Sequence, residues 1–394
     1  MTARAPRHWL LYLSVSTALL HAAFQSIRVL VSYRTLALGG DATTIGIITA
    51  LYALVPLLAA VWLGRTVDRG HATLVLRLGI AVTALGGALI AFSSGLVVLA
   101  LGNVVLGLGQ LLATVSGQAF VSILSRPGEL DRGFAGMTLG VSIGQALGVP
   151  VAGLIAHTGS DGGPVETTGA LLTMTVAAAL ALPLILGLRQ EPGSGRQAGD
   201  KAPQSVRSML GMRGMKPALL SSMVVLASLD LVVAYLPLLG EEFGFSVLLV
   251  TVLLTARTVA SIVSRALLPW ALHRLPRKWV LFAATAGTVV PIALVPLVPN
   301  PWFIGAMLAV CGVFWGAGQP LTMTWVVELV APSDRASALA VRLTGNRLAQ
   351  VAVPLGAGAV AGTTGVASLF WVTAAMLSSA AWSTWRAFPS VRSA

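Results

Sequence analysis

Residues 43–63 read TTIGIITALYALVPLLAAVWL, and residues 64–69 continue as GRTVDR. The first segment carries no charged side chain over 21 positions. A helix needs about 20 apolar residues to cross a hydrocarbon layer about 30 Å thick, and in lipid every backbone polar group must be bonded within the protein. The segment therefore predicts a membrane-spanning helix, with the charged run after it at the membrane surface.

The rest of the chain is similarly apolar. It is 56% hydrophobic and 10% charged, with a mean hydropathy of +0.87, whereas soluble domains carry about 25% charged residues. This composition excludes a soluble globular protein and predicts an all-α membrane protein with twelve transmembrane helices. We interpret the first segment as an uncleaved helix and not as a secretory signal. The apolar segments are 9–31, 43–63, 73–93, 96–123, 134–156, 168–188, 218–239, 247–269, 279–298, 302–327, 337–361 and 366–386.

The longest polar break divides these segments into two sets of six. We expect a six-helix bundle at 1–188, a cytoplasmic linker at 189–217 and a second six-helix bundle at 218–394. Similar motifs recur in the two halves 203 to 205 residues apart, which indicates an internal duplication of the kind that builds many transporters. The matched motifs are Asp131-Arg132 with Asp334-Arg335, Val149-Pro150 with Val353-Pro354, and Asp68 with His273.

The formal net charge of +12 follows the membrane topology. Most basic residues lie in or beside the segments that face the cytoplasm when the N-terminus is placed there, as the positive-inside rule requires. The sequence thus predicts a protein of a bacterial cytoplasmic (inner) membrane, with both termini in the cytoplasm and no binding of nucleic acid. The outward loops hold one basic residue, Arg34, and five acids: Asp41, Asp161, Glu166, Glu241 and Glu242.

The run after the second apolar segment resembles a signature of the major facilitator superfamily. Gly64, Asp68 and Arg69 match it, although its basic tail is missing here. The resemblance implies two pseudo-symmetric six-helix bundles and a secondary transporter that works by alternating access. It also implies gating at the cytoplasmic helix ends, where Asp68 meets the start of the eleventh helix when that side is closed. The gating candidates are Gly64, Asp68, Arg69, Asp131, Arg132, Arg274, Asp334 and Arg335.

Four charged residues inside the apolar segments are candidates for the substrate and coupling site. Asp230, Arg257 and Arg347 each lie within about 3 Å of the centre of their segment, and Arg28 lies about 12 Å toward the outside. A charge in the middle of the bilayer costs at least about 2.5–3.5 kcal/mol to insert, so it faces protein or water and marks function by default. The alternative is a buried ion-pair network that only holds helices together.

Further polar residues extend this site. Arg342, Asn346 and Gln350 are spaced four apart and therefore share one helix face. Taken singly, each polar side chain also fits a hydrogen bond between helices, and the histidine fits a structural role. The polar candidates for the substrate and coupling site are His21, Gln25, Asn103, Gln145, Gln319 and Asn346.

Glycines recur every four residues in segment 134–156, and small residues recur at the same spacing in segment 247–269. Such stripes let helices approach closely, so we expect these two helices to pack at the interface of the halves. The end of the glycine stripe, GVPVAG at 148–153, resembles a motif of antiporters in the superfamily and favours export, although Asn103 stands where proton-coupled drug exporters have arginine. The stripe and its proline are Gly136, Gly140, Gly144, Gly148 and Pro150.

These observations favour a proton-coupled transporter that exports a small organic solute, anionic or zwitterionic because arginines outnumber acids in the membrane. Proton-coupled uptake of an organic anion is the alternative, and a membrane-embedded enzyme or a channel is less favoured. We expect no cofactor and no metal, since Cys311 is the only cysteine and the five histidines are scattered. The expected partners are the solute, protons and the lipid bilayer, and the expected oligomeric state is a monomer.

Overall fold

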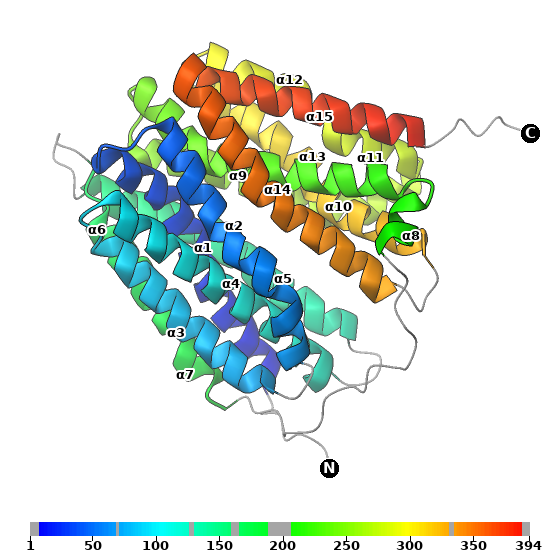
Figure 1. Cartoon of the computed structure of the whole chain (residues 1–394), viewed down its shortest axis with the longest axis horizontal. Helices are drawn as coiled ribbons and strands as arrows, with labels where there is room; N and C mark the ends of the chain where they lie inside the picture. The colour runs from blue at the N-terminus through cyan, green and yellow to red at the C-terminus, as the bar shows by residue number, and fades with distance from the viewer. Residues whose placement is uncertain are drawn as a thin grey trace, which may run out of the picture. The chain divides into compact units, whose positions relative to one another are not determined.

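The computed structural model describes residues 8–67, 71–125, 130–158, 165–187, 206–330 and 335–387 (Figure 1). Every regular element in these ranges is a helix, which confirms the predicted all-α fold. The chain forms two compact units. Unit 1 comprises Met1–Gly199 with Phe245–Thr255, and unit 2 comprises Asp200–Gly244 with Ala256–Ala394.

Unit 1 is built from seven helices in its described residues, together with the beginning of α10. α1 packs along α5, and α4 contacts both α3 and α2 (Figure 1). The helices are α1 (Trp9–Ala37), α2 (Ala42–Thr66), α3 (Ala72–Ala91), α4 (Leu96–Leu124), α5 (Leu130–Thr158), α6 (Thr168–Ala179) and α7 (Ala181–Ile185).

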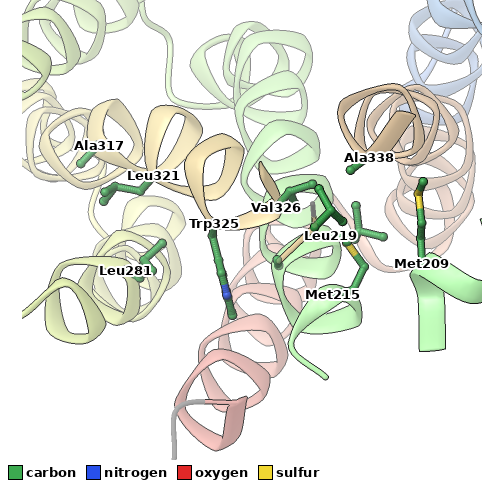
Figure 2. Close-up of a cluster of buried hydrophobic side chains, with 11 residues drawn as sticks. Met209, Met215, Leu219, Leu281, Ala317, Leu321, Trp325, Val326 and Ala338 are labelled. Carbon is green, nitrogen blue, oxygen red and sulfur yellow. The ribbon is translucent and has the colours of Figure 1, made fainter. Parts of the chain in front are cut away.

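Unit 2 is arranged around α9, which contacts α13, α14 and α15. At one end of this unit a buried apolar cluster joins α8 to α9, α13 and α14 through Met209, Leu219, Trp325 and Ala338 (Figure 2). The elements are α8 (Val206–Gly211), α9 (Met215–Glu242), α10 (Val247–Arg274), α11 (Arg277–Ala286), α12 (Val289–Leu294), η2 (Val295–Leu297), α13 (Pro301–Glu328), α14 (Arg335–Thr364) and α15 (Ala367–Ala387).

Ten segments in the described part of the chain are long and apolar enough to cross a membrane. α14 and α15 have 30 and 21 residues, which suffices in length at about 1.5 Å per residue, but they are not among those ten. α14 carries Arg335, Arg342 and Arg347, and these charges lower its apolar content. The count of twelve spanning helices therefore stays a prediction.

Two segments that were predicted as single helices are each broken in two. α6 ends at Ala179, four residues before Pro183, and α11 ends at Ala286, five residues before Pro291. Proline has no N–H to donate to the carbonyl four residues earlier, and its ring clashes with that carbonyl. Each pair still forms one candidate span, at Thr168–Ile185 and Arg277–Leu297.

The ends of several helices are fixed by local chemistry. At the start of α2, the Asp41 carboxylate accepts hydrogen bonds from the backbone N–H and the hydroxyl of Thr44, at 2.8 and 2.7 Å. Before α13, the Asn300 side chain accepts from the backbone N–H groups of Trp302 and Phe303, as a helix N-cap does. Between α14 and α15, Gly365 has a φ of 88°, a left-handed conformation that favours glycine.

Glycine contacts in the two units correspond to each other. On α4, a Cβ at Gly107 would collide with the carbonyl oxygen of Tyr52 on α2; on α13, a Cβ at Gly316 would lie 2.5 Å from the carbonyl oxygen of Ser261 on α10. Gly316 follows Gly107 by 209 positions, and Ser261 follows Tyr52 by the same 209 positions. The predicted repeat therefore extends to the packing of equivalent helix pairs.

A second pair of contacts has the same spacing. Asn103 on α4 donates a hydrogen bond of 2.6 Å to the carbonyl oxygen of Ile48 on α2. The residues 209 positions later are Gly312 on α13 and Arg257 on α10, and a Cβ at Gly312 would collide with the carbonyl oxygen of Arg257. Arg257, a candidate site residue, is thus held at a point where two helices approach closely.

Candidate functional site

The centre of unit 2 contains a network that joins α9 to α14. Asp230 on α9 is 5% exposed, and its Oδ2 accepts a hydrogen bond of 2.6 Å from Nε2 of Gln350. The Oε1 of Gln350 accepts a hydrogen bond of 3.0 Å from Nη1 of Arg347. One amide therefore connects a buried carboxylate with a guanidinium, and the sequence analysis had placed Asp230 and Arg347 in the site without this link.

Arg257 is the third charged candidate in unit 2. It is 7% exposed, and its Nη2 donates to the hydroxyl of Thr258 at 3.3 Å. A charge in such a position needs polar partners, because removing it from water carries a penalty of several kcal/mol.

The polar stripe on α14 faces neighbouring helices of its own unit. Asn346 is 3% exposed, and its Oδ1 accepts a hydrogen bond of 2.9 Å from Ser222 on α9. Nearer the start of the helix, Nη2 of Arg342 donates to Oε1 of Gln319 on α13 at 2.7 Å. Arg342 and Gln350 were not predicted as site residues, although their spacing of four from Asn346 was a signal that could have identified them.

In unit 1, His21 borders a cavity of about 170 Å³ that is lined by residues of α1, α3, α4 and α5. Its Nδ1 lies 3.0 Å from the carbonyl oxygen of Thr17. A carbonyl oxygen only accepts, so Nδ1 carries the hydrogen, and in the neutral ring Nε2 is a hydrogen-bond acceptor. Thr114, Gln118 and Thr138 add polar atoms to the cavity wall.

The remaining unit 1 candidates lie in different environments. The guanidinium of Arg28 lies 4.9 Å from the ring centroid of Tyr52, within the range of a cation–π contact. Asn103 uses its amide nitrogen to join α4 to α2. Gln25 and Gln145 are half-buried, and in the described part of the chain neither has a hydrogen-bond partner, so their amides are available to a solute.

The glycine stripe of α5 packs against α1 inside unit 1. A Cβ at Gly140 would collide with the carbonyl oxygen of Ser14, and one at Gly144 with that of Ala18. On α10, the hydroxyl of Ser264 bonds the carbonyl oxygen of Val313 on α13 at 2.5 Å. These stripe residues contact neighbours within their own bundles, while a Cβ at Gly153, near the end of α5, would collide with Thr251 on α10. Packing of the two helices at the interface of the halves stays a prediction.

The gating candidates lie mostly outside the described structure. Asp68, Arg69 and Asp334 are not among the described residues, and the same holds for the side chains of Asp131, Arg132 and Arg335. Gly64 lies in the last turn of α2. Arg274 ends α10 and is exposed, with its guanidinium 6.0 Å from the ring centroid of Trp270.

Charged groups also join the ends of helices in unit 1. Arg34 near the end of α1 donates from Nη2 to the carbonyl oxygen of Ser93 at 2.6 Å, and from Nη1 to the hydroxyl of Thr168 at 3.5 Å. Hydrogen bonds from the side chain and backbone of Thr168, with a smaller contribution from the charge of Arg34, lower the pKa of Glu166 below 4.5. The end of α1 is thereby connected to α3 and to the start of α6.

Among the described residues no group of three or more His, Cys, Asp or Glu side chains is placed to hold a metal ion. The arrangement instead supplies a buried acid, buried cations and free amides, in spanning helices of both units. Such groups can bind a polar solute and a proton inside a membrane.

Comparison with known proteins identifies the family. The sequence profile of the Major Facilitator Superfamily matches residues 13–251 and 218–393. No curated protein matches the chain by sequence.

Solved structures of transporters share the fold. A variant of the nucleoside transporter NupG is 17% identical, with a TM-score of 0.81 over 96% of this chain and 100% of that one. The D-xylose–proton symporter is 16% identical, with a TM-score of 0.78 over 97% and 98%. A bacterial homolog of the human lysosomal transporter Spinster is 16% identical, with a TM-score of 0.75 over 96% of each chain. The chain is therefore a transporter and not an enzyme, and it belongs to the Major Facilitator Superfamily.

Proposed function

We propose that this chain is a proton-coupled secondary transporter that exports a small organic anion or zwitterion across a bacterial cytoplasmic membrane by alternating access. The observation that carries the proposal is the Asp230–Gln350–Arg347 network. It combines a group that can take up a proton, on the candidate spanning helix α9, with a cation that can bind an anion, on α14.

The network offers a direct route for coupling. A solute carboxylate that binds Arg347 competes with Oε1 of Gln350 for the guanidinium N–H groups, since charge-assisted hydrogen bonds are stronger than those to a neutral amide. Gln350 is then free to turn away from Asp230. In this proposal the Asp230 carboxylate, no longer engaged by the amide, is the group that binds the proton. Departure of the solute reverses these steps and releases the proton, so this route moves solute and proton in the same direction, as the uptake alternative requires. Export by antiport requires instead that the solute and the proton occupy the network in turn.

The charges in the spanning helices favour an anionic or zwitterionic solute. The basic residues outnumber the acidic ones: Asp230 is the one acid near the middle of the segments, and the arginine candidates are Arg28, Arg257 and Arg347. Gln25 and Gln145, which have no hydrogen-bond partner in the described residues, are available for its uncharged polar part. His21 offers Nε2 as an acceptor in the same role.

Two features bear on the direction of transport. The run Gly148–Gly153 resembles the antiporter motif of the superfamily and supports export. The alternative is uptake of an organic anion together with a proton, which is supported by the structural similarity to a proton symporter of D-xylose.

The remaining parts of the proposal follow the sequence. Both termini lie in the cytoplasm, twelve helices span the membrane as two bundles at 1–188 and 218–394, and the protein is a monomer. The gating groups at the cytoplasmic helix ends, Asp68 and Arg335 among them, close that side without binding the solute.

The test uses the purified full-length protein in liposomes that contain a pH-sensitive dye. Benzoate, succinate and glycerol 3-phosphate are added as anions, and D-xylose and uridine serve as uncharged controls. We expect at least one anion to produce a proton flux that the controls do not, and an imposed pH gradient to drive its movement. Preloaded liposomes show the direction, since export by antiport and uptake by symport move the proton oppositely relative to the anion.

Two results would contradict the proposal. If D-xylose or uridine moves protons while no anion does, the assignment of an anionic solute is wrong. If an anion exchanges across the membrane but no pH gradient drives it, proton coupling is wrong and the transporter assignment stands.

A further inference from the structure

Arg342 is a second buried cation in unit 2, separate from the Asp230 network. It lies on α14 and is 9% exposed. Its Nη2 is the donor in three contacts, to Oε1 of Gln319 at 2.7 Å and to the carbonyl oxygen of Gln319 and the hydroxyl of Thr322 at 3.3 Å each. All three acceptors are uncharged. In the part of the chain that the structure describes, no carboxylate contacts this guanidinium.

Two donor nitrogens of this pair have no acceptor among the described residues. Nε of Arg342 and Nε2 of Gln319 are both buried and make no hydrogen bond to the described residues. The orientation of the Gln319 amide follows from its contact: the atom that accepts from Arg342 is the oxygen, so the nitrogen is the unused end. A buried cation with neutral partners and two unused donors beside it has the polarity of an anion site.

We infer that Arg342 and Gln319 form an anion subsite that takes a carboxylate group. A carboxylate has two oxygens in one plane, which match the planar guanidinium better than a spherical ion does. Arg342 precedes Arg347 by five residues, hence by about 7.5 Å along α14, toward the end of the helix that the charge distribution places in the cytoplasm. In the context of the proposed function, on which this assignment of ligand class rests, the subsite receives the carboxylate of the transported anion on the cytoplasmic side of Asp230.

The experiment measures binding of acetate, the simplest stable carboxylate probe, by thermal unfolding of the purified full-length protein. Acetate replaces chloride at constant ionic strength, up to about 0.1 M. A ligand that binds only the folded state raises its stability, and we expect Tm to rise by about 2–4 °C. Sulfate at the same ionic strength serves as a second anion. Equal Tm values in chloride, sulfate and acetate would overturn the assignment of a carboxylate.

Two variants locate the site. Arg342→Gln should abolish the acetate shift, whereas Arg386→Gln, which removes an exposed arginine at the end of α15, should leave it unchanged. Gln319→Glu supplies a carboxylate from the protein itself, in place of an amide whose oxygen already contacts Arg342. This variant should be at least as stable as the wild type and should no longer respond to acetate, so the test remains valid if Arg342→Gln does not fold.

An acetate shift that persists in Gln319→Glu would overturn the inference. Asp230→Asn separates the two proposals, because it removes the group proposed to carry the proton and leaves Arg342 and Gln319 in place. A normal acetate shift in a protein that shows no proton coupling leaves the subsite standing and contradicts only the proposed coupling. Proton-coupled transport without an acetate shift contradicts the anion subsite and leaves the proposed coupling standing.

Discussion

Gln350 on α14 donates a hydrogen bond of 2.6 Å from Nε2 to Oδ2 of Asp230 on α9, across 120 positions of the sequence. The same amide accepts from Arg347 through its oxygen. Gln350 and Asp230 are both buried. If the charge of Asp230 or Arg347 changes, the amide or its protein neighbours must therefore rearrange their hydrogen bonds. Inside a protein such a hydrogen bond is electrostatically stronger than in water.

Asp230→Asn tests the proton-carrying group. Asparagine keeps an oxygen that can accept from Gln350, so we expect the stability to fall by about 1 kcal/mol and the protein to insert normally. Because the amide does not titrate, a pH gradient should no longer drive accumulation of the solute. Exchange of solute between the two sides should remain within a few-fold of the wild type. Liposome transport with and without a pH gradient measures both quantities.

The double variant Asp230→Asn with Arg347→Gln separates coupling from a static ion network. If the network only stabilises the fold, removing both charges avoids the cost of an uncompensated buried charge, about 3–5 kcal/mol, and restores transport driven by the gradient. Under our proposal folding recovers but gradient-driven transport does not. Accumulation at the wild-type level in Asp230→Asn alone would exclude Asp230 as the proton carrier.

Gly144→Leu should abolish transport even where the protein is inserted. A Cβ at Gly144 would collide with the carbonyl oxygen of Ala18 and lie 3.0 Å from its Cα, so a larger side chain separates α5 from α1. Overpacking of this kind costs about 1–3 kcal/mol or more. Gly356→Ala on α14 is the control, because no atom lies within 4 Å of its added Cβ. Equal thermal stability and transport in both variants would contradict the observed packing.

Glu166→Gln should weaken the protein at neutral pH and reduce its sensitivity to acid. The pKa of Glu166 lies below 4.5 in the folded protein, so its stabilising contribution is present above pH 4.5 and is lost as the pH falls through the folded pKa. The residue is exposed, and the contribution is therefore small, about 0.2–1 kcal/mol. Thermal unfolding between about pH 6 and pH 3.5 should show a smaller decrease of Tm in the variant than in the wild type.

The sequence predicted the helices well and their contacts poorly. Segments such as 43–63 are helical because an uncharged run of that length has no other stable form in lipid. The breaks before Pro183 and Pro291 follow from the missing proline N–H, and the segment lengths alone concealed them. Spacing showed that α5 has a flat glycine face, but it carries no information about which helix covers that face.

In the candidate site, too, the residues could be predicted from the sequence and their contacts could not. Charge and depth identified Asp230, Arg257 and Arg347 as candidates, since buried charges are rare. The link through Gln350 depends on how α9 and α14 are rotated toward each other, which the sequence of neither helix specifies. Arg342 belonged to the recognised stripe, yet its partner Gln319 lies on another helix, and only the fold shows that this pair has two unused donors.

Gly312→Ala tests the position of Arg257 through its backbone. A Cβ at Gly312 on α13 would collide with the carbonyl oxygen of Arg257 and lie 3.0 Å from the Cβ of Ala260. Backbone atoms have no other rotamer to adopt, so α10 has to move away from α13 and carry Arg257 with it. We expect a loss of about 1–3 kcal/mol in stability and a decrease in transport that exceeds the decrease in folded protein.

Gly318→Ala on the same helix is the matched control. Its added Cβ would meet Ala284 at 3.5 Å and Val225 at 3.6 Å, which are ordinary van der Waals contacts. Alanine is also the better helix former, by about 0.8–1.0 kcal/mol in water, so this variant should transport like the wild type. Transport per folded molecule and Tm are measured for both. Because Arg257 is a candidate for the substrate site, Gly312→Ala should also raise the anion concentration needed for half-maximal transport, whereas an unchanged value would contradict a contact between Arg257 and the solute.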